Sequence, residues 1–227
     1  MEVAHLIEGN RPSLCIDTCS LLDVMRDPTR TTANPGERRA MLRLIEGSVS
    51  GQVNCLIAEQ VHFEFVEHDR RVQEEASKNL VALLKQVARV NEIVSIYGAV
   101  GEIDLSHIED HVTRARAHLQ EWIETLHQVV PESEASARAF ARMRGNRAPA
   151  RRGKDSSKDC LIFETYLGAG RALREAGMTA PIVFLSSNTS EYLTESRVLK
   201  AEIAEDLDPI SMLYAPSAGA AVRALGL

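Results

Sequence analysis

The sequence is poor in several features that would each indicate a class of protein. Aromatic residues make up 4% of the 227 residues, too few to form platforms on which nucleic-acid bases stack. No apolar run approaches the roughly 18 residues that a membrane-spanning helix needs. The four cysteines include no CxxC pair, which argues against a disulfide framework and a ribbon-type zinc site. A glycine-rich phosphate loop is also absent.

The remaining composition is that of an ordinary globular chain, with 44% hydrophobic and 26% charged residues. The segment 1–12 carries Glu2 and Glu8, and its apolar stretch is too short for a signal peptide. We therefore expect a soluble, cytoplasmic protein with no membrane partner. The length suits a single domain over residues 1–227, whose core needs no disulfides.

Positive charge is concentrated in one segment of an otherwise acidic chain. Residues 142–158 include seven basic residues and one acid, whereas the rest of the chain has 19 basic and 31 acidic residues. One interpretation of this segment is a solvated loop. The other is a strip that binds phosphates, because Lys and Arg close to a nucleic-acid backbone release counterions. The residues that we assign to nucleic-acid binding are Arg147, Arg151, Arg152, Lys154 and Lys158.

Strand and helix patterns alternate at both ends of the chain, which favours an α/β fold with a mainly parallel sheet. Short apolar runs predict strands at 13–16, 53–58, 181–185 and 210–214. Helical periodicity predicts helices over 37–46, from 60 to a break at Gly98, and over 105–129, 132–143, 157–176 and 189–204. The predicted organisation includes an all-helical insertion at about 67–143 and a basic loop at about 144–156.

Two apolar stripes run along the helices of this insertion, one through Leu80 and Val87 and the other through Leu119 and Trp122. The stripes predict an antiparallel helical hairpin with Trp122 buried between its two helices. The alternative is that part of the stripe is exposed and forms a surface for a second copy or another partner.

Oxygen-bearing side chains stand where the predicted strands end. Asp17 follows the first strand, Glu64 lies six residues past the second, and Asn188 lies three residues past Leu185. Asp159 is in the first turn of the helix after the basic loop. These side chains should converge, because ligands of open parallel sheets bind beyond the carboxyl ends of the strands. Clustered carboxylates repel unless a cation neutralises them, and hard oxygen ligands favour Mg²⁺ or Mn²⁺.

Each of these residues also has a purely structural interpretation. Asp17 resembles a helix N-cap, Asn188 a turn residue, and Glu64 one of several surface glutamates. Asp155 is either an additional acid one helical turn before Asp159 or the cap of that helix. The joint arrangement at one sheet edge is what favours a site.

Four segments together resemble the PIN domain, particularly its longer bacterial PIN-like relatives. The segments are SLCIDTCSLLDVM, VHFEF, KDSSKDCLIFETYL and VFLSSNTSEY. The resemblance covers about residues 12–68 and 150–215. It implies a three-layer α/β/α sandwich with a parallel central sheet, here enlarged by the insertion, and metal-dependent cleavage of RNA.

The resemblance also assigns individual residues. It places the first three acids of the family at Asp17, Glu64 and Asp159. Ser186 and Asn188 fall on the last strand-turn of the family, and Glu191 takes the place of the acid in its Asp-Phe pair. Asn188 in place of Asp removes one negative charge, which argues against tight binding of a second metal.

We therefore expect a nuclease dependent on Mg²⁺ or Mn²⁺ that acts on RNA rather than DNA. The expected metal ligands are Asp17, Glu64 and Asp159, with Asn188 completing the catalytic set. The expected supporting residues are Ser186, Asp155 and Glu191. The alternative is a PIN-like scaffold with little or no catalysis that binds nucleic acid or a protein. A second copy of the chain and an inhibitory protein are the further partners that this resemblance allows.

Overall fold

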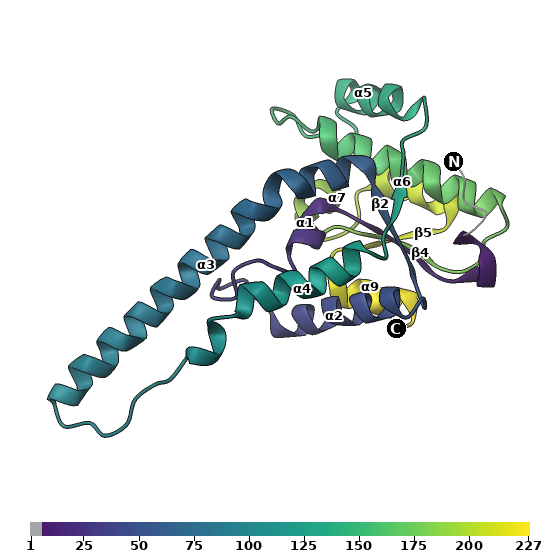
Figure 1. Ribbon diagram of the computed structural model, residues 1–227. Coiled ribbons are helices and arrows are strands. Elements are labelled where there is room, and N and C mark those ends of the chain that lie inside the picture. Colours follow the sequence, from purple (N-terminus) through teal and green to yellow (C-terminus); the bar gives the residue numbers. More distant parts are fainter. Residues whose placement is uncertain (1–5) are drawn as a thin grey trace.

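The computed structural model describes residues 6–227, so Glu2 lies outside the described residues. The described residues form one five-stranded, all-parallel sheet in the order β3-β2-β1-β4-β5 (Figure 1). Its strands are β1 (Ser13–Ile16), β2 (Asn54–Ala58), β3 (His127–Val129), β4 (Ile182–Leu185) and β5 (Met212–Ala215). The central strand β1 is buried at every position and pairs with β2 and β4, as expected for a strand covered on both faces.

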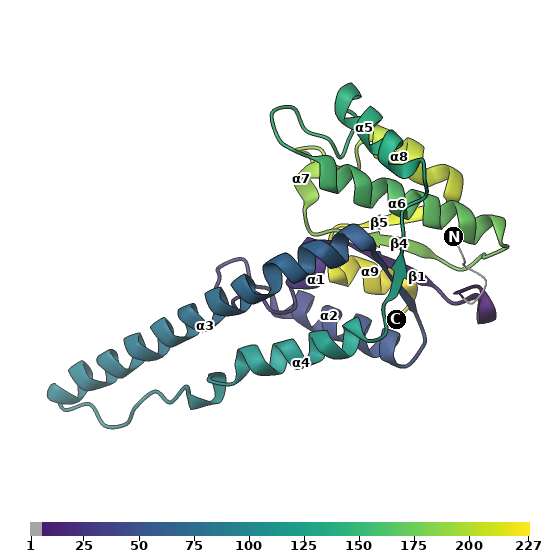
Figure 2. The same ribbon diagram turned by 45° about the horizontal axis from the view of Figure 1, so that its top comes forward.

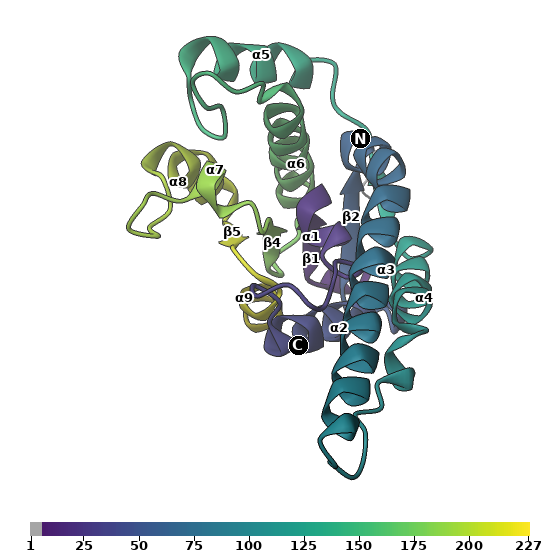
Figure 3. The same cartoon turned by 90° about the vertical axis from the view of Figure 1, so that its left-hand side faces the viewer.

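Helices cover both faces of the sheet, which gives the three-layer α/β/α sandwich expected from the sequence (Figures 1 and 3). One face is covered by α2 (Pro35–Val49), α4 (His111–Ile123) and α9 (Ala218–Leu225). The other face is covered by α6 (Ser157–Glu175) and α8 (Ala201–Leu207), with α5 (Ala135–Gly145) packed on the outside of α6. The remaining elements are α1 (Thr18–Leu22), α3 (Glu59–Ile96), α7 (Thr189–Tyr192), η2 (Glu8–Asn10), η3 (Ser106–Ile108) and η4 (Asp208–Ile210).

The sequence predicted that the segment 67–143 is all-helical, but the segment includes the strand β3. The helix expected over 105–129 divides into η3, α4 and the edge strand β3, whose residues Leu56↔His127 and Ala58↔Val129 pair with β2. Apolar residues at helical spacing continue to Leu126, and a strand of three residues is too short to show its own alternation. The helix expected over 189–204 is likewise interrupted, because Leu193 and Leu199 form an isolated antiparallel bridge between α7 and α8.

The two insertion helices run antiparallel and are in contact, as predicted, but their apolar stripes do not pack chiefly against each other (Figures 1 and 2). The helix α4 packs chiefly on α2, and Trp122 has no exposed surface because it belongs to the main core beneath the sheet. The apolar stripe on α3 is buried less completely. Leu80 is buried, while Leu83, Leu84 and Val87 are only half-buried. The two apolar stripes therefore serve different parts of the molecule.

The helix α3 is the longest element, and its far end extends away from the sandwich (Figures 1 and 2). Its first half carries the buried side chains, from Val61 to Leu80, whereas none of its residues after Leu80 is buried. At a rise of about 1.5 Å per residue, its 38 residues span roughly 57 Å. Despite this length, none of the described helices is apolar enough over a sufficient stretch to cross a membrane.

The ends of the two strands nearest the candidate site are joined by one buried side chain. The hydroxyl of Tyr166 on α6 donates to the carbonyl oxygen of Ile16 at the end of β1 and accepts from the Ala58 N–H at the end of β2, at 3.0 Å. Asp17 and α3 follow directly after these strand ends. Tyr166 thus fixes the relative positions of the two segments that carry Asp17 and Glu64.

Candidate metal centre

Four carboxylates from four separate elements gather at the carboxyl edge of the sheet. Asp17 precedes α1, Glu64 lies in the second turn of α3, Asp159 in the first turn of α6, and Glu191 in α7. Burial is the largest cause of the raised pKa of Asp17 and of Asp159, and the neighbouring charges add to it: Glu64 and Glu191 at Asp17, and Glu191 and Asp17 at Asp159. The structure therefore brings the three acids predicted as metal ligands together with Glu191, a residue predicted only to support them.

Asp17 is buried, with 4% of its surface exposed, and it caps α1. One carboxylate oxygen, Oδ1, accepts from the Thr18 N–H at 2.8 Å. The other, Oδ2, accepts from the Ser186 hydroxyl at 2.6 Å. Burial raises the pKa of Asp17 to about 6, although these two hydrogen bonds oppose the shift. The N-cap interpretation and the site interpretation of Asp17 thus describe the same side chain.

Glu64 is connected to Asp17 through Thr18. The Thr18 hydroxyl donates to Glu64 Oε2 at 2.7 Å, while Gln60 Nε2 donates to Glu64 Oε1 at 3.3 Å. Thr18 therefore orients both acids, one through its backbone and the other through its side chain. The sequence analysis did not identify Thr18, although its position directly after Asp17 at the start of a helix was visible.

Glu191 and Asp159 share a cation from their own chain. The Lys154 ammonium donates to Glu191 Oε1 and lies 3.8 Å from Asp159 Oδ2. Burial and the neighbouring Glu191 charge raise the pKa of Asp159 to about 7, and Lys154 opposes this shift. Glu191 has no exposed surface, and its second oxygen, Oε2, is buried without a hydrogen-bond partner. An unpartnered buried carboxylate oxygen is costly. A hydrogen bond between the Asp159 and Glu191 carboxyl groups also raises the pKa of Asp159, so either a proton on Asp159 or a cation would reduce this cost.

The other predicted site residues have different surroundings. Ser186 is fully buried and contacts Asp17 as described. Asn188 directs its Oδ1 to the Ser190 hydroxyl, which donates to it at 3.2 Å. Asp155 is exposed and accepts from the Ser157 N–H at 2.9 Å, which lowers its pKa; it lies one residue before Ser156, the N-cap of α6, and binds the first amide of that helix.

Most basic residues of this segment are paired with acids, carbonyl groups or a hydroxyl group of the same chain. Arg142 is buried between Glu164 and Asp206, and Arg147 pairs with Asp206 at 3.0 Å. The other partners are Ser190 for Arg151 and Glu67 for Lys158. Among the five residues assigned to nucleic-acid binding, only Arg152 makes no hydrogen bond or ion pair with the described residues. Five of the seven basic residues in this segment therefore have partners within residues 6–227, whereas Arg144 and Arg152 have none.

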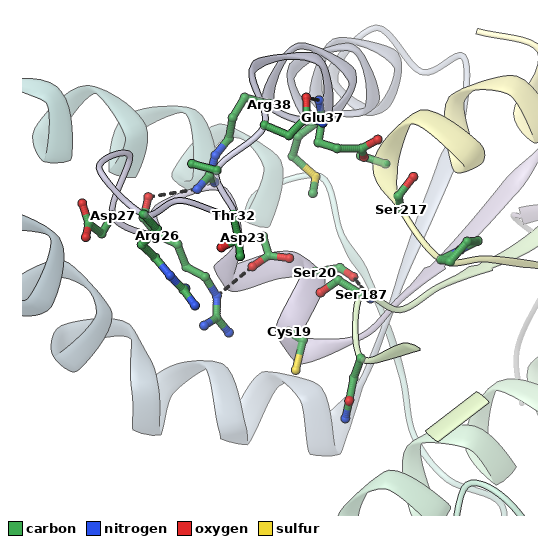
Figure 4. Close-up of a pocket in the computed structure, with 17 residues that line it drawn as sticks. Cys19, Ser20, Asp23, Arg26, Asp27, Thr32, Glu37, Arg38, Ser187 and Ser217 are labelled. Atoms are coloured by element: carbon green, nitrogen blue, oxygen red, sulfur yellow. Dashed lines mark hydrogen bonds and ion pairs between the residues drawn. The ribbon is translucent and has the colours of Figure 1, made fainter. Parts of the chain in front are cut away.

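A cavity of about 550 Å³ lies beside α1 (Figure 4), and none of the four acids lines it. Cys19 and Ser187 line one side of the cavity. In the chain, Cys19 follows shortly after Asp17, and Ser187 directly follows Ser186. Arg26 and Arg38 line the other side, where Arg26 pairs with Asp23 at 2.7 Å. Its volume is in the range typical of sites for small ligands or parts of larger ones.

The donor set fits a hard divalent cation by its chemistry, because it consists of carboxylate oxygens and includes the unpartnered Glu191 Oε2. The present side-chain positions do not enclose such an ion: within residues 6–227, no three His, Cys, Asp or Glu side chains are arranged to hold one. Thr18 and Ser186 engage both oxygens of Asp17, and Lys154 engages Glu191. Binding of a cation at this edge would require some of these contacts to change.

The model of the PIN domain family matches residues 14–192, well over half of the chain. The chain belongs to the PIN domain family. The match includes every element that carries the four acids, from β1 to α7. No curated protein and no solved structure matches the chain significantly. Membership places this PIN domain in a family whose fold is that of metal-dependent nucleases.

Proposed function

We propose that this PIN domain is a nuclease dependent on Mg²⁺ or Mn²⁺ that hydrolyses phosphodiester bonds of RNA. The observation that carries the proposal is the convergence of Asp17, Glu64, Asp159 and Glu191 from four elements onto one sheet edge in a chain of this family. Carboxylates from separate elements would be held this close, at a cost in repulsion, in order to bind a cation. The preference for RNA over DNA rests on the resemblance to the family.

Asp17, Glu64 and Asp159 would hold the cation, with Glu191 beside them. The bound cation would polarise the scissile phosphate and lower the pKa of a water molecule that attacks it. The chain itself supplies the orientation: Ser186 and Thr18 fix Asp17, and Thr18 also fixes Glu64. Arg152, which is free of partners within the described residues, would bind the phosphate backbone electrostatically.

Cleavage assays on matched substrates test this proposal. Single-stranded RNA and DNA of the same sequence are incubated with Mg²⁺, with Mn²⁺ or with EDTA. We expect cleavage of the RNA only in the presence of metal, and Asp17→Asn should abolish it. The matched control is Asp155→Asn, which removes an exposed carboxylate close to Asp159 and should retain cleavage. Equal cleavage by Asp17→Asn and the unaltered protein would show that the site assignment is wrong.

A second candidate function is a scaffold that binds a protein and has little catalysis. It is favoured by the exposed hydrophobic side chains between Val81 and Ile103, which account for half of the large exposed hydrophobic residues in residues 6–227. Such a surface would serve a second copy of the chain or an inhibitory protein. Metal-stimulated cleavage distinguishes the two functions, because a scaffold would bind RNA or a protein without cleaving.

A further inference from the structure

Three arginines, Arg26, Arg30 and Arg38, belong to the lining of the cavity beside α1 (Figure 4). Arg26 Nε lies 2.7 Å from Asp23 Oδ1, which makes an ion pair. The side chain of Arg30 makes no hydrogen bond or ion pair with the described residues. Arg38 Nη2 donates to the Arg26 carbonyl oxygen at 2.9 Å, an acceptor without a charge. Two of the three guanidinium groups therefore have no carboxylate in direct contact within residues 6–227.

Arg38 is the least satisfied of the three. Its second terminal nitrogen, Nη1, is buried and has no hydrogen-bond partner in the described part of the chain. Burial lowers the pKa of Arg38, and the charges of Arg26 and Arg30 add to this shift. The charges of Asp23 and Asp27 oppose the shift without reversing it. An anion in contact with Nη1 would offset both the burial and the repulsion between the arginines.

Three carboxylates also line the cavity, but two of them make their hydrogen bonds with uncharged groups. One oxygen of Asp27 accepts from the N–H and the hydroxyl of Thr29, both at 2.8 Å, and the other accepts from Asn79 Nδ2 at 2.7 Å. Glu37 Oε2 accepts from the Gly219 N–H at 3.0 Å. Neither carboxylate forms an ion pair with an arginine of the cavity. The third carboxylate is the partner of Arg26 described above.

Hydroxyl groups from two separate segments add donors to this lining. The side chains of Thr32 and Ser187 make no hydrogen bond within residues 6–227. The Ser187 N–H donates to the Ser20 hydroxyl at 2.8 Å, which attaches this segment to α1. Guanidinium groups and hydroxyl groups are the side-chain donors that bind phosphate oxygens in proteins. The cavity therefore offers several donors of this kind at once.

We propose that this cavity binds a phosphate group through the guanidinium groups of Arg30 and Arg38. The phosphate is either the free ion or part of a nucleotide, because both present the same oxygens. The volume of about 550 Å³ is larger than a phosphate ion alone would need. None of the four acids lines the cavity, so binding there requires neither a metal ion nor cleavage.

A titration with inorganic phosphate, followed by nitrogen-15 NMR of the arginine Nε–H groups, tests the inference. The full-length protein is kept in EDTA at constant ionic strength, which chloride maintains. We expect the Arg38 signal to shift saturably. In Arg30→Met the dissociation constant of phosphate should rise about tenfold or more, because a charge-assisted hydrogen bond is lost. The matched control is Arg39→Met, which removes the same charge from an exposed side chain outside the cavity and should leave the affinity unchanged.

A tetranucleotide of RNA with a 5′-phosphate identifies the source of the phosphate. It is titrated in EDTA under the same conditions, so that no metal-dependent cleavage takes place. Tighter binding of the tetranucleotide than of inorganic phosphate, weakened by Arg30→Met, would assign the cavity to a nucleic-acid phosphate. Binding of inorganic phosphate that the tetranucleotide does not exceed would assign the cavity to the free ion.

Three outcomes would overturn the inference. They are the absence of a saturable shift in the unaltered protein, an unchanged affinity in Arg30→Met, and an equal loss of affinity in Arg39→Met. The last outcome would mean that phosphate responds to net charge rather than to the cavity. Arg30→Met should fold normally, because its side chain is exposed and makes no hydrogen bond with the described residues. All of these measurements are made without metal, so their failure would leave the proposed cleavage at the four acids unaffected.

Discussion

The buried side chain of Asp17 caps α1 and accepts a hydrogen bond from the Ser186 hydroxyl. It also belongs to the cluster of four acids at the sheet edge. Its two hydrogen bonds favour the charged form of the carboxylate, but burial opposes them more strongly and raises its pKa. The folded, metal-free protein therefore binds a proton at Asp17 that the unfolded chain has already released. This difference makes the stability of the metal-free protein depend on pH.

The sign of that dependence follows from the raised pKa. The contribution of Asp17 is fully present below pH 3.8, the ordinary value, and is lost as the pH rises through about 6. Asparagine carries no charge, so Asp17→Asn should gain stability relative to the unaltered protein between about pH 4 and pH 7. We expect a relative gain on the order of 3 kcal/mol, measured by urea unfolding in EDTA. A difference between the two proteins that stays constant with pH would contradict this prediction.

Arg152 and Arg147 are five residues apart in the chain but have different surroundings. Arg147 donates to Asp206, Glu205 and the Glu202 carbonyl oxygen, whereas Arg152 is exposed and makes no such contact within the described residues. Arg152→Ala should therefore weaken binding of any RNA sequence and reduce the slope of log K against log[salt] by about one. Arg147→Ala should change the slope less and lower the melting temperature more, because it removes contacts to α8.

At the scale of elements, α4 shows how an apolar stripe acquires a different partner from the expected one. Trp122 and Leu119 are fully buried against the main core, on the face that also carries α2. Trp122→Ala should cost about 3–5 kcal/mol in the free energy of unfolding, the usual range for a large buried aromatic side chain. Denaturant unfolding measures this loss. The control is Tyr97→Ala, where the ring is 86% exposed and the cost should be within the error of the measurement.

The two halves of α3 should differ in local stability. Buried side chains hold Glu59–Leu80 against the sandwich, but few side chains contact the helix from Val81 to Ile96. Native-state hydrogen exchange followed by mass spectrometry should show that amides of the second half open at a lower free energy than those of the first. Equal protection along the whole helix would mean that the distal half has a partner in solution.

The sequence predicted some elements well and others poorly for identifiable reasons. The strands β1, β2 and β4 are continuous buried apolar runs, and α6 ends within one residue of its predicted end. The strand β3 could not be predicted, because its three residues are held in the sheet by pairing with β2 rather than by a pattern of their own. Packing decides such elements, and packing is not visible in local periodicity.

For the whole molecule, topology predicts the site better than its detailed contacts. The rule that strand ends share one edge brings Asp17, Glu64 and Asp159 together without knowledge of any distance. The same rule does not predict the position of Lys154. That position depends on the turn at Gly153 and on the hydrogen bond from Arg151 to Ser190 on α7. Loop conformation is set by tertiary contacts, so the cation among the acids could be found only in the structure.

The length of α3 also determines how the molecule behaves in solution. A compact chain of 227 residues has a radius of gyration of about 17 Å. The single helix α3, at roughly 57 Å, is longer than the diameter of such a body. Small-angle X-ray scattering should therefore give a larger radius of gyration and a pair-distance distribution with an extended tail. Rotational diffusion should be anisotropic for the same reason, slowest for tumbling that turns the axis of α3 end over end.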